Sequence, residues 1–148
     1  MGLVLNRPLE AEIAEHLPVW QHLCSAPQRI FEGGPVQREV AIALGCHAPG
    51  DPGEGWTAVN DVLGLLDLGR DPTELWGELE RLRIFSGYAG WAAGQLEGEV
   101  REQAWFVVEA DPKDPFTEDN EGLWQRVMRR QPGSLAMFAT FPPDPSLN

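Results

Sequence analysis

Glycine and proline interrupt this chain so often that only short helices and strands can form between them. The 148 residues include 16 glycines and 13 prolines. Proline ends regular backbone hydrogen bonding, and glycine favours sharp turns. Between these breaks, runs typical of strands alternate with runs of helical periodicity, without a regular strand–helix repeat. The pattern predicts a single domain over residues 1–148 with an α+β fold, a mixed sheet packed with helices.

Several segments have the apolar or β-branched composition of strands. The expected strands are 2–6, 29–32, 40–46, 83–91 and 104–110. The Gly33-Gly34-Pro35 turn separates the second from the third, so the simplest arrangement is a wide hairpin. The run 56–66 also has β-branched residues near its start.

Other segments have the apolar spacing of helices. The expected helices are 9–17, a helix from Asp71 carrying Leu75, Leu79 and Leu82 on one face, 95–103 and 117–130. Asp71 is followed by Pro72 and Glu74, which is the pattern of a capped helix start. In 95–103, Leu96 and Val100 are expected to face the core. Residues 142–148 are expected to form a loose tail.

The charge balance argues against direct contact with nucleic acid. Lys and Arg number 11 against 23 Asp and Glu, a net charge of −12, which repels phosphate backbones. Arg126, Arg129 and Arg130 form the one basic cluster. They lie near an expected helix C-terminus, where positive charges interact favourably with the negative end of the helix macrodipole. DNA binding through this helix remains the weaker alternative.

The sequence predicts a cytoplasmic protein without a membrane segment. No apolar run approaches the roughly 18 residues that a membrane helix needs, and "MGLVLNRP" does not resemble a signal peptide. In this compartment Cys24 and Cys46 are expected to be free thiols.

The chain lacks the common signatures of cofactor, metal and nucleophile sites. A phosphate loop and a GxGxxG fingerprint are absent, and Ile84 replaces the first glycine that a nucleophile elbow around Ser86 would need. His22 with Cys24, and Cys46 with His47, do not have a zinc-site spacing. We therefore predict no cofactor, no metal and no catalytic residue.

Five motifs resemble those of the YqgE/AlgH family of small bacterial proteins. They are "GLVLNRP" (2–8), "FEGGPV" (31–36), a histidine after an apolar run (His47), "VNDVL" (59–63) and "GYAGWAAGQLEGEV" (87–100) followed by Trp105. The resemblance covers nearly the whole chain. It implies a mixed, partly barrel-like sheet packed with helices, and a tight passage from strand to helix at the glycines. Members are often labelled transcriptional regulators, and the resemblance implies no catalytic residues.

Family members usually carry further strand-forming residues before "GLVLNRP". Either this chain is truncated there or it lacks those strands. A missing strand would leave an unpaired sheet edge, which favours a homodimer.

The motifs define a candidate binding patch, provided that their segments converge. It comprises Asn6, Arg7, Gly33, Gly34, Pro35, His47, Asp61, Gly87, Tyr88, Gly90, Trp91, Gly94, Gln95 and Glu97. The leading interpretation is a non-enzymatic regulatory or interaction protein that binds a protein or small-molecule partner and acts on transcription indirectly. The alternative is a ligand-binding protein or an enzyme that uses the passage 87–97, with Arg7, His47, Asp61 and Glu97 as its polar candidates.

Overall fold

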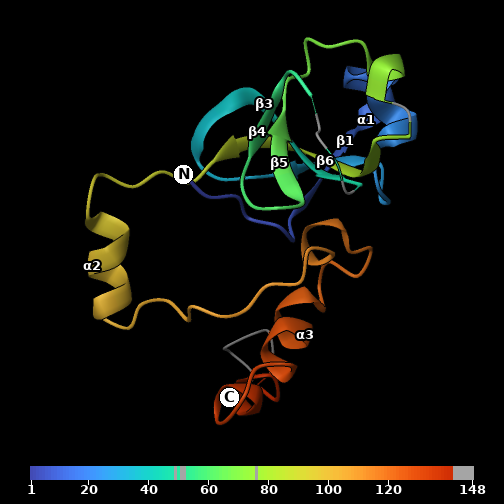
Figure 1. The fold of residues 1–148 in the computed structure, drawn as a ribbon. Helices are drawn as coiled ribbons and strands as arrows, with labels where there is room; N and C mark the ends of the chain where they lie inside the picture. The colour runs from blue at the N-terminus through green and yellow to red at the C-terminus, as the bar shows by residue number, and fades with distance from the viewer. Residues whose placement is uncertain (49, 51–52, 76, 142–148) are drawn as a thin grey trace.

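The computed structural model describes residues 1–48, 50, 53–75 and 77–141, which form a curved six-stranded sheet with short helices around it (Figure 1). The strands are β1 Pro8–Glu12, β2 Arg29–Glu32, β3 Val36–His47, β4 Trp56–Ala58, β5 Leu63–Leu66 and β6 Leu79–Tyr88. The α-helices are α1 Ile13–His16, α2 Gln95–Arg101, α3 Leu123–Arg129 and α4 Leu135–Phe138, and the 3-10 helices are η1 Pro18–Leu23, η2 Pro72–Leu75 and η3 Asp114–Phe116. The predicted α+β class is confirmed.

The sheet is mixed and has the strand order β1-β2-β6-β3-β5-β4. The long strands β3 and β6 pair antiparallel at its centre, whereas β2 runs parallel to β6. Strands β1 and β4 are its two edges, so the sheet does not close into a barrel. The wide hairpin expected from β2 and β3 is wrong, because β6 lies between them.

The second half of β3 and the part of β6 from Leu82 are buried on both faces. Ala43, Leu82 and Ile84 belong to one apolar cluster, while Leu44 and Phe85 belong to the other. Successive side chains of a strand point to opposite faces. A strand covered on both sides therefore reads as a continuous apolar run, which explains why residues 40–46 of β3 and 83–88 of β6 were predictable. The strand expected over 83–91 ends at Tyr88.

The N-terminal predictions are wrong. Within 2–6 the structure has no strand beyond an isolated bridge at Gly2, and the strand β1 starts at Pro8 instead. The expected helix 9–17 is reduced to α1. Leu9 and Ala11 alternate with exposed neighbours along β1, and pairing with β2 prevails over helical spacing there.

The helix expected from Asp71 is also wrong beyond one turn. The Asp71 carboxylate accepts the backbone N–H of Thr73, as a cap should, but only the 3-10 turn η2 follows. Leu79 and Leu82 belong to β6, where Leu82 is fully buried and Leu79 packs against the same apolar cluster. Packing in the sheet therefore prevails over helical spacing.

Other predictions hold in part. Run 56–66 forms the β4–β5 hairpin, with the Asn60 side chain accepting two backbone N–H groups in its turn. Helix 117–130 is confirmed only as α3, from Leu123. Cys24 and Cys46 are free and buried. Residues 142–148, predicted as a loose tail, lie outside the described residues. None of the helices in the described ranges has the length and apolar character to cross a membrane.

Candidate functional site

Three of the motif segments meet at the end of β6. The Val4 N–H donates to the Gly33 carbonyl, and the Gly33 N–H donates to the Ser86 carbonyl, each with a 2.9 Å N–O distance. Gly2 and Ala89 exchange a pair of backbone hydrogen bonds, also at 2.9 Å. Chain segments far apart in sequence are therefore joined here by their backbones.

The motif glycines make this meeting possible, because their backbones pass too closely for a side chain. A Cβ atom on Gly33 would lie 2.2 Å from the Gly87 carbonyl oxygen, and one on Gly34 would lie 2.2 Å from the Tyr88 carbonyl carbon. Gly87 also has a φ of 69°, in the left-handed region. These glycines therefore serve close packing between β6 and the turn before β3.

After Ala89 the chain leaves the sheet in an excursion that we call the arm, residues 90–110 (Figure 1). The helix α2 occupies its outer part and stands apart from the sheet, and none of its residues is buried. The expectation that Leu96 and Val100 face the core is therefore wrong: the Leu96 side chain is exposed and Val100 is only half-buried. The predicted start of α2 at Gln95 is confirmed, with Gly94 at φ 77° before it.

Glu99 organises the arm. Its carboxylate accepts hydrogen bonds from the indole N–H of Trp105 at 2.7 Å and of Trp91 at 3.1 Å, and from the Gln95 amide at 3.0 Å. The bonds from Trp105, Gln95 and Trp91 hold the pKa of Glu99 below its usual value. The two indole rings meet edge to face with centroids 6.0 Å apart. Sequence reasoning missed Glu99, although its place four residues after Gln95 was a usable signal.

The second half of the arm is exposed and apolar. The strand predicted for 104–110 is wrong, since the segment lies outside both helix and sheet. The exposed fractions are 50% for Trp105, 51% for Phe106 and 75% for Val107. Phe106 packs on Phe138 of α4, with ring centroids 4.9 Å apart. A contiguous apolar surface of this kind usually marks a contact site.

Two further patch residues lie at the other end of β3. His47 is buried and meets the Trp56 ring edge to face at 5.1 Å, and its backbone N–H donates to Val62 at 3.1 Å. Asp61 is exposed on the neighbouring β4–β5 turn. The motif glycines flank the start of β3 and His47 ends it, so the patch residues divide into two groups.

The remaining residues of the candidate patch lie at separate places on the surface. Arg7 is exposed and lies 3.9 Å from the Glu32 carboxylate, while Glu97 is exposed on α2. Asn6 is half-buried, and Pro35 and Gly90 are exposed. The four residues considered for catalysis therefore lie on four different segments.

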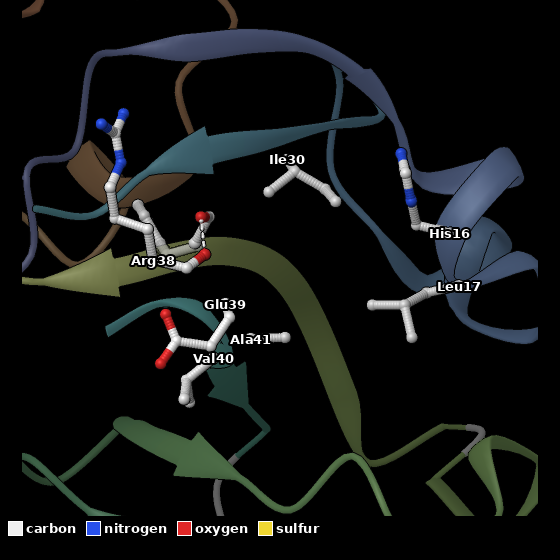
Figure 2. Close-up of a pocket in the computed structure, with 9 residues that line it drawn as sticks. His16, Leu17, Ile30, Arg38, Glu39, Val40 and Ala41 are labelled. Carbon is white, nitrogen blue, oxygen red and sulfur yellow. Dashed lines mark hydrogen bonds between the residues drawn. The ribbon is translucent and has the colours of Figure 1, made fainter. Parts of the chain in front are cut away.

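A cavity of about 280 Å³ opens between α1, the first half of β3 and Phe85–Ser86 of β6 (Figure 2). Strand β3 leaves its register with β6 between Val36 and Ala41, and Gln37 in this bulge has a φ of 47°. The Ser86 hydroxyl donates to the Arg38 carbonyl, and the Arg38 guanidinium is 2.8 Å from the Glu32 carboxylate. The motifs did not point to Arg38.

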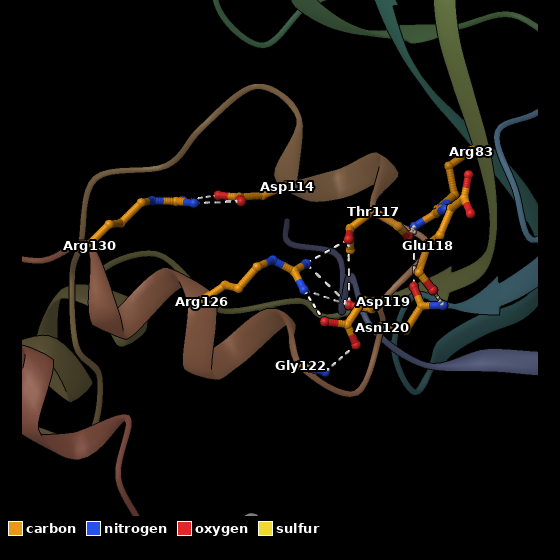
Figure 3. A network of polar contacts seen from close by, with 9 residues as sticks. All are labelled: Arg83, Asp114, Thr117, Glu118, Asp119, Asn120, Gly122, Arg126 and Arg130. Atoms are coloured by element: carbon orange, nitrogen blue, oxygen red, sulfur yellow. Dashed lines mark hydrogen bonds and ion pairs between the residues drawn. The ribbon is translucent and has the colours of Figure 1, made fainter.

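A buried arginine of β6 holds the segment around η3 to the sheet, and two ion pairs hold α3 to that segment (Figure 3). Arg83 donates to the carbonyl groups of Pro115 and Thr117, and its guanidinium lies 4.1 Å from the centre of the Phe31 ring. Asp114 pairs with Arg130. Burial is the largest single effect on Asp114 and opposes its ionisation. The hydrogen bonds from Arg130 and from the Asp111 backbone N–H, together with the charges of Arg130 and Arg126, outweigh burial and keep the pKa of Asp114 below its usual value.

The basic cluster considered for DNA binding is largely neutralised in this network. Arg126 pairs with Asp119, and Arg130 pairs with Asp114, while Arg129 and Arg130 are both exposed. Two of the three guanidinium groups already have carboxylate partners.

Comparison with known proteins gives consistent matches over most of the chain. The profile of a family described as AlgH-like matches residues 1–136. A UPF0301 protein of Streptomyces coelicolor is 45% identical over 152 residues, covering 100% of this chain and 79% of the relative, and one of Thermobifida fusca is 42% identical over 156 residues, with the same two coverages.

Two solved structures share the fold. Protein DIP2367 of Corynebacterium diphtheriae superposes with a TM-score of 0.88 at 32% identity, covering 94% of this chain and 74% of that one. The solution structure of the AlgH protein of Pseudomonas aeruginosa superposes with a TM-score of 0.66 at 29% identity, covering 97% and 78%.

Proposed function

The chain belongs to the AlgH-like family, and from this premise we propose that it is a non-enzymatic cytoplasmic interaction protein that acts through its arm on another protein. The names of its relatives state no activity, so the proposal is argued from the site. A regulatory effect on transcription would then be indirect, through the bound protein.

The observation that carries this proposal is the exposed apolar half of the arm. Trp105, Phe106 and Val107 are consecutive and at least half exposed. Aromatic residues supply much of the energy of protein interfaces, and a soluble protein rarely leaves three large apolar neighbours in water without a partner. The hydrogen bonds of Glu99 hold Trp105 in one orientation, which lowers the entropy cost of binding.

The polar residues support the same reading. An active site needs an acid, a base or a nucleophile within reach of one another. Arg7, His47, Asp61 and Glu97 instead lie on separate segments. The net charge of −12 and the carboxylate partners of Arg126 and Arg130 oppose direct DNA binding.

Site-specific photocrosslinking in cells tests the proposal. A photoreactive residue at Val107 should give a discrete protein adduct, because this side chain is 75% exposed in the centre of the apolar segment. The matched control is the same residue at Val59, which is 60% exposed on the β4–β5 hairpin. Equal adducts at both positions, or none at Val107, would refute the function.

A second candidate function is the binding of a small molecule in the cavity beside the bulge of β3. The left-handed Gln37 favours it, because strained backbone tends to occur at functional sites. The volume of this cavity, about 280 Å³, lies just below the range of about 300–1,000 Å³ that is usual for small-molecule sites. A thermal-shift screen with nucleotides, anions and metabolites tests this candidate, and an increase in Tm that Ser86→Leu removes would support it.

A further inference from the structure

Two adjoining cavities lie where the segment around η3 packs on the central strands. Their volumes are about 280 Å³ and about 310 Å³, and both are lined by Arg81 of β6 and by Lys113, which precedes η3. Each volume is close to the lower limit of about 300 Å³ for a small-molecule site. Together, the two cavities therefore offer a ligand more room than either offers alone.

The two shared cations have no carboxylate partner. Acidic residues outnumber Lys and Arg by 23 to 11, and six arginines in the described ranges form ion pairs. Among the residues that the structure describes, neither Arg81 nor Lys113 has a carboxylate at ion-pair distance. Lys113 is also the only lysine in the sequence. These two side chains are therefore available to bind the carboxylate of a ligand.

The smaller cavity has an apolar wall. Cys46 lies directly opposite Arg81 in the pairing of β3 with β6, so their side chains lie on the same face of the sheet. Val62 and Pro112 also line this cavity. Burial, together with the negative charge of Glu80, raises the pKa of Cys46, so its thiol remains neutral at neutral pH. This wall suits the apolar part of a ligand.

The larger cavity has an acidic group that is also unpaired. Arg126 and Arg130 line it, but both already have carboxylate partners (Figure 3). Glu118 lines it as well, and in the described part of the molecule its carboxylate has neither a hydrogen bond nor an ion pair. An ammonium group in this cavity would therefore find a free carboxylate beside the two free cations.

From this arrangement we propose that the two cavities together bind a free α-amino acid with an apolar side chain. Its carboxylate binds Arg81 and Lys113, its ammonium group binds Glu118, and its side chain packs on Cys46 and Val62. This site is separate from the contact proposed for the arm, because no residue of 90–110 lines either cavity.

The charge of the whole chain favours a zwitterion over other ligands with an anionic group. A net charge of −12 repels polyanions and disfavours phosphate dianions, whereas an α-amino acid carries no net charge at neutral pH. Exposed ion pairs contribute little affinity by themselves. We therefore expect burial of the apolar side chain to determine which amino acids bind.

Titration of the full chain with L-leucine, followed by amide NMR spectra, tests the site. We expect leucine to shift the amide signals of Cys46, Arg81 and Lys113. Three matched probes each lack one feature: leucine methyl ester has no carboxylate, isocaproate has no ammonium group and glycine has no apolar side chain. Each of them should bind at least about tenfold more weakly than leucine.

Three variants separate this site from general effects. Arg81→Gln and Lys113→Gln should each weaken leucine binding by about tenfold and leave the fold intact, because both side chains are exposed. Arg129→Gln removes an exposed cation that lines neither cavity and should leave the binding unchanged.

Four results would overturn the proposal. The first is no leucine-dependent shift at millimolar concentration, and the second is leucine binding that Arg81→Gln and Lys113→Gln leave unchanged. The third is binding of isocaproate or inorganic phosphate as tight as that of leucine, which would indicate an unspecific anion contact. The fourth is binding that Ser86→Leu abolishes and Arg81→Gln retains, which would place leucine in the cavity beside the bulge of β3.

Discussion

Replacing Arg83 with methionine should detach the C-terminal helices from the sheet and lower the stability of the whole chain. The side chain is 1% exposed and donates to the carbonyl oxygens of Ala26 at 2.6 Å, Pro115 at 2.9 Å and Thr117 at 3.0 Å. Methionine has a similar length but no donor, so the variant leaves all three oxygens without this partner. Asn120, at 3.4 Å, loses a weaker contact.

The expected loss of unfolding free energy in Arg83→Met follows from these hydrogen bonds and from the cost of burying the charge. A hydrogen bond to a charged group contributes about 1.5–3 kcal/mol, so three bonds set an upper range of about 5–9 kcal/mol. Burial of the guanidinium opposes this gain, lowers the pKa of Arg83 to about 10, and leaves its Nε atom without a partner. The net loss expected for Arg83→Met is therefore about 3–5 kcal/mol.

Chemical denaturation followed by circular dichroism measures this loss directly. For a domain of this size the corresponding decrease in Tm is about 6–20 °C. Arg83→Lys keeps the charge but reaches fewer oxygens. Its stability should therefore lie between that of the unmodified protein and that of Arg83→Met. Arg81→Met is the control, because Arg81 is exposed two residues earlier on the same strand. A loss below about 1 kcal/mol for Arg83→Met would refute the reasoning.

Three further predictions concern the motif glycines, the arm and the thiols. Gly34→Ala should destabilise the protein by about 2–3 kcal/mol in denaturant titration, because its Cβ would lie 2.2 Å from the Tyr88 backbone, and a neutral result would contradict the close approach. The pKa of Glu99 is lowered in the folded arm, so its ionised carboxylate stabilises the arm fully above about pH 4.5, and this stabilisation is lost as the pH falls through the folded pKa. Tryptophan fluorescence should follow that loss, and Glu99→Gln should abolish the pH dependence. Because burial raises the pKa of Cys24 to about 12, iodoacetamide should label it at pH 8 only after unfolding, and rapid labelling of the native protein would disprove its burial.

For some helices and strands, the neighbouring residues alone were sufficient to predict the element. Strand β2, most of β3 and the apolar part of β6 were predictable because their apolar runs end at glycine or proline. The start of α2 at Gln95 was predictable for the same reason, since Gly94 adopts a left-handed conformation before it. In each of these cases the signal lies within a few residues of the element.

The spacing of apolar residues gave wrong predictions where the same residues suit both a helix and a strand. Leu9 with Ile13, and Leu79 with Leu82, have helical spacing, yet Leu9, Leu79 and Leu82 lie in strands. A helix of this length gains most of its stability from packing, so the available partner decides between helix and strand. For these segments the partners are β2 and β3, which lie far away in sequence.

The sequence by itself determined the family, the α+β class, the free thiols and the places where elements break, because these depend on composition and on neighbouring residues. Only the tertiary structure decided the strand order, the separation of His47 from the motif glycines, the burial of Arg83 and the exposure of "WFVV" on the arm. Each of these depends on which distant segments pair and on what remains uncovered afterwards. Apolar residues determine that a segment gains free energy from burial, whereas the assembled fold determines whether a surface is there to bury it.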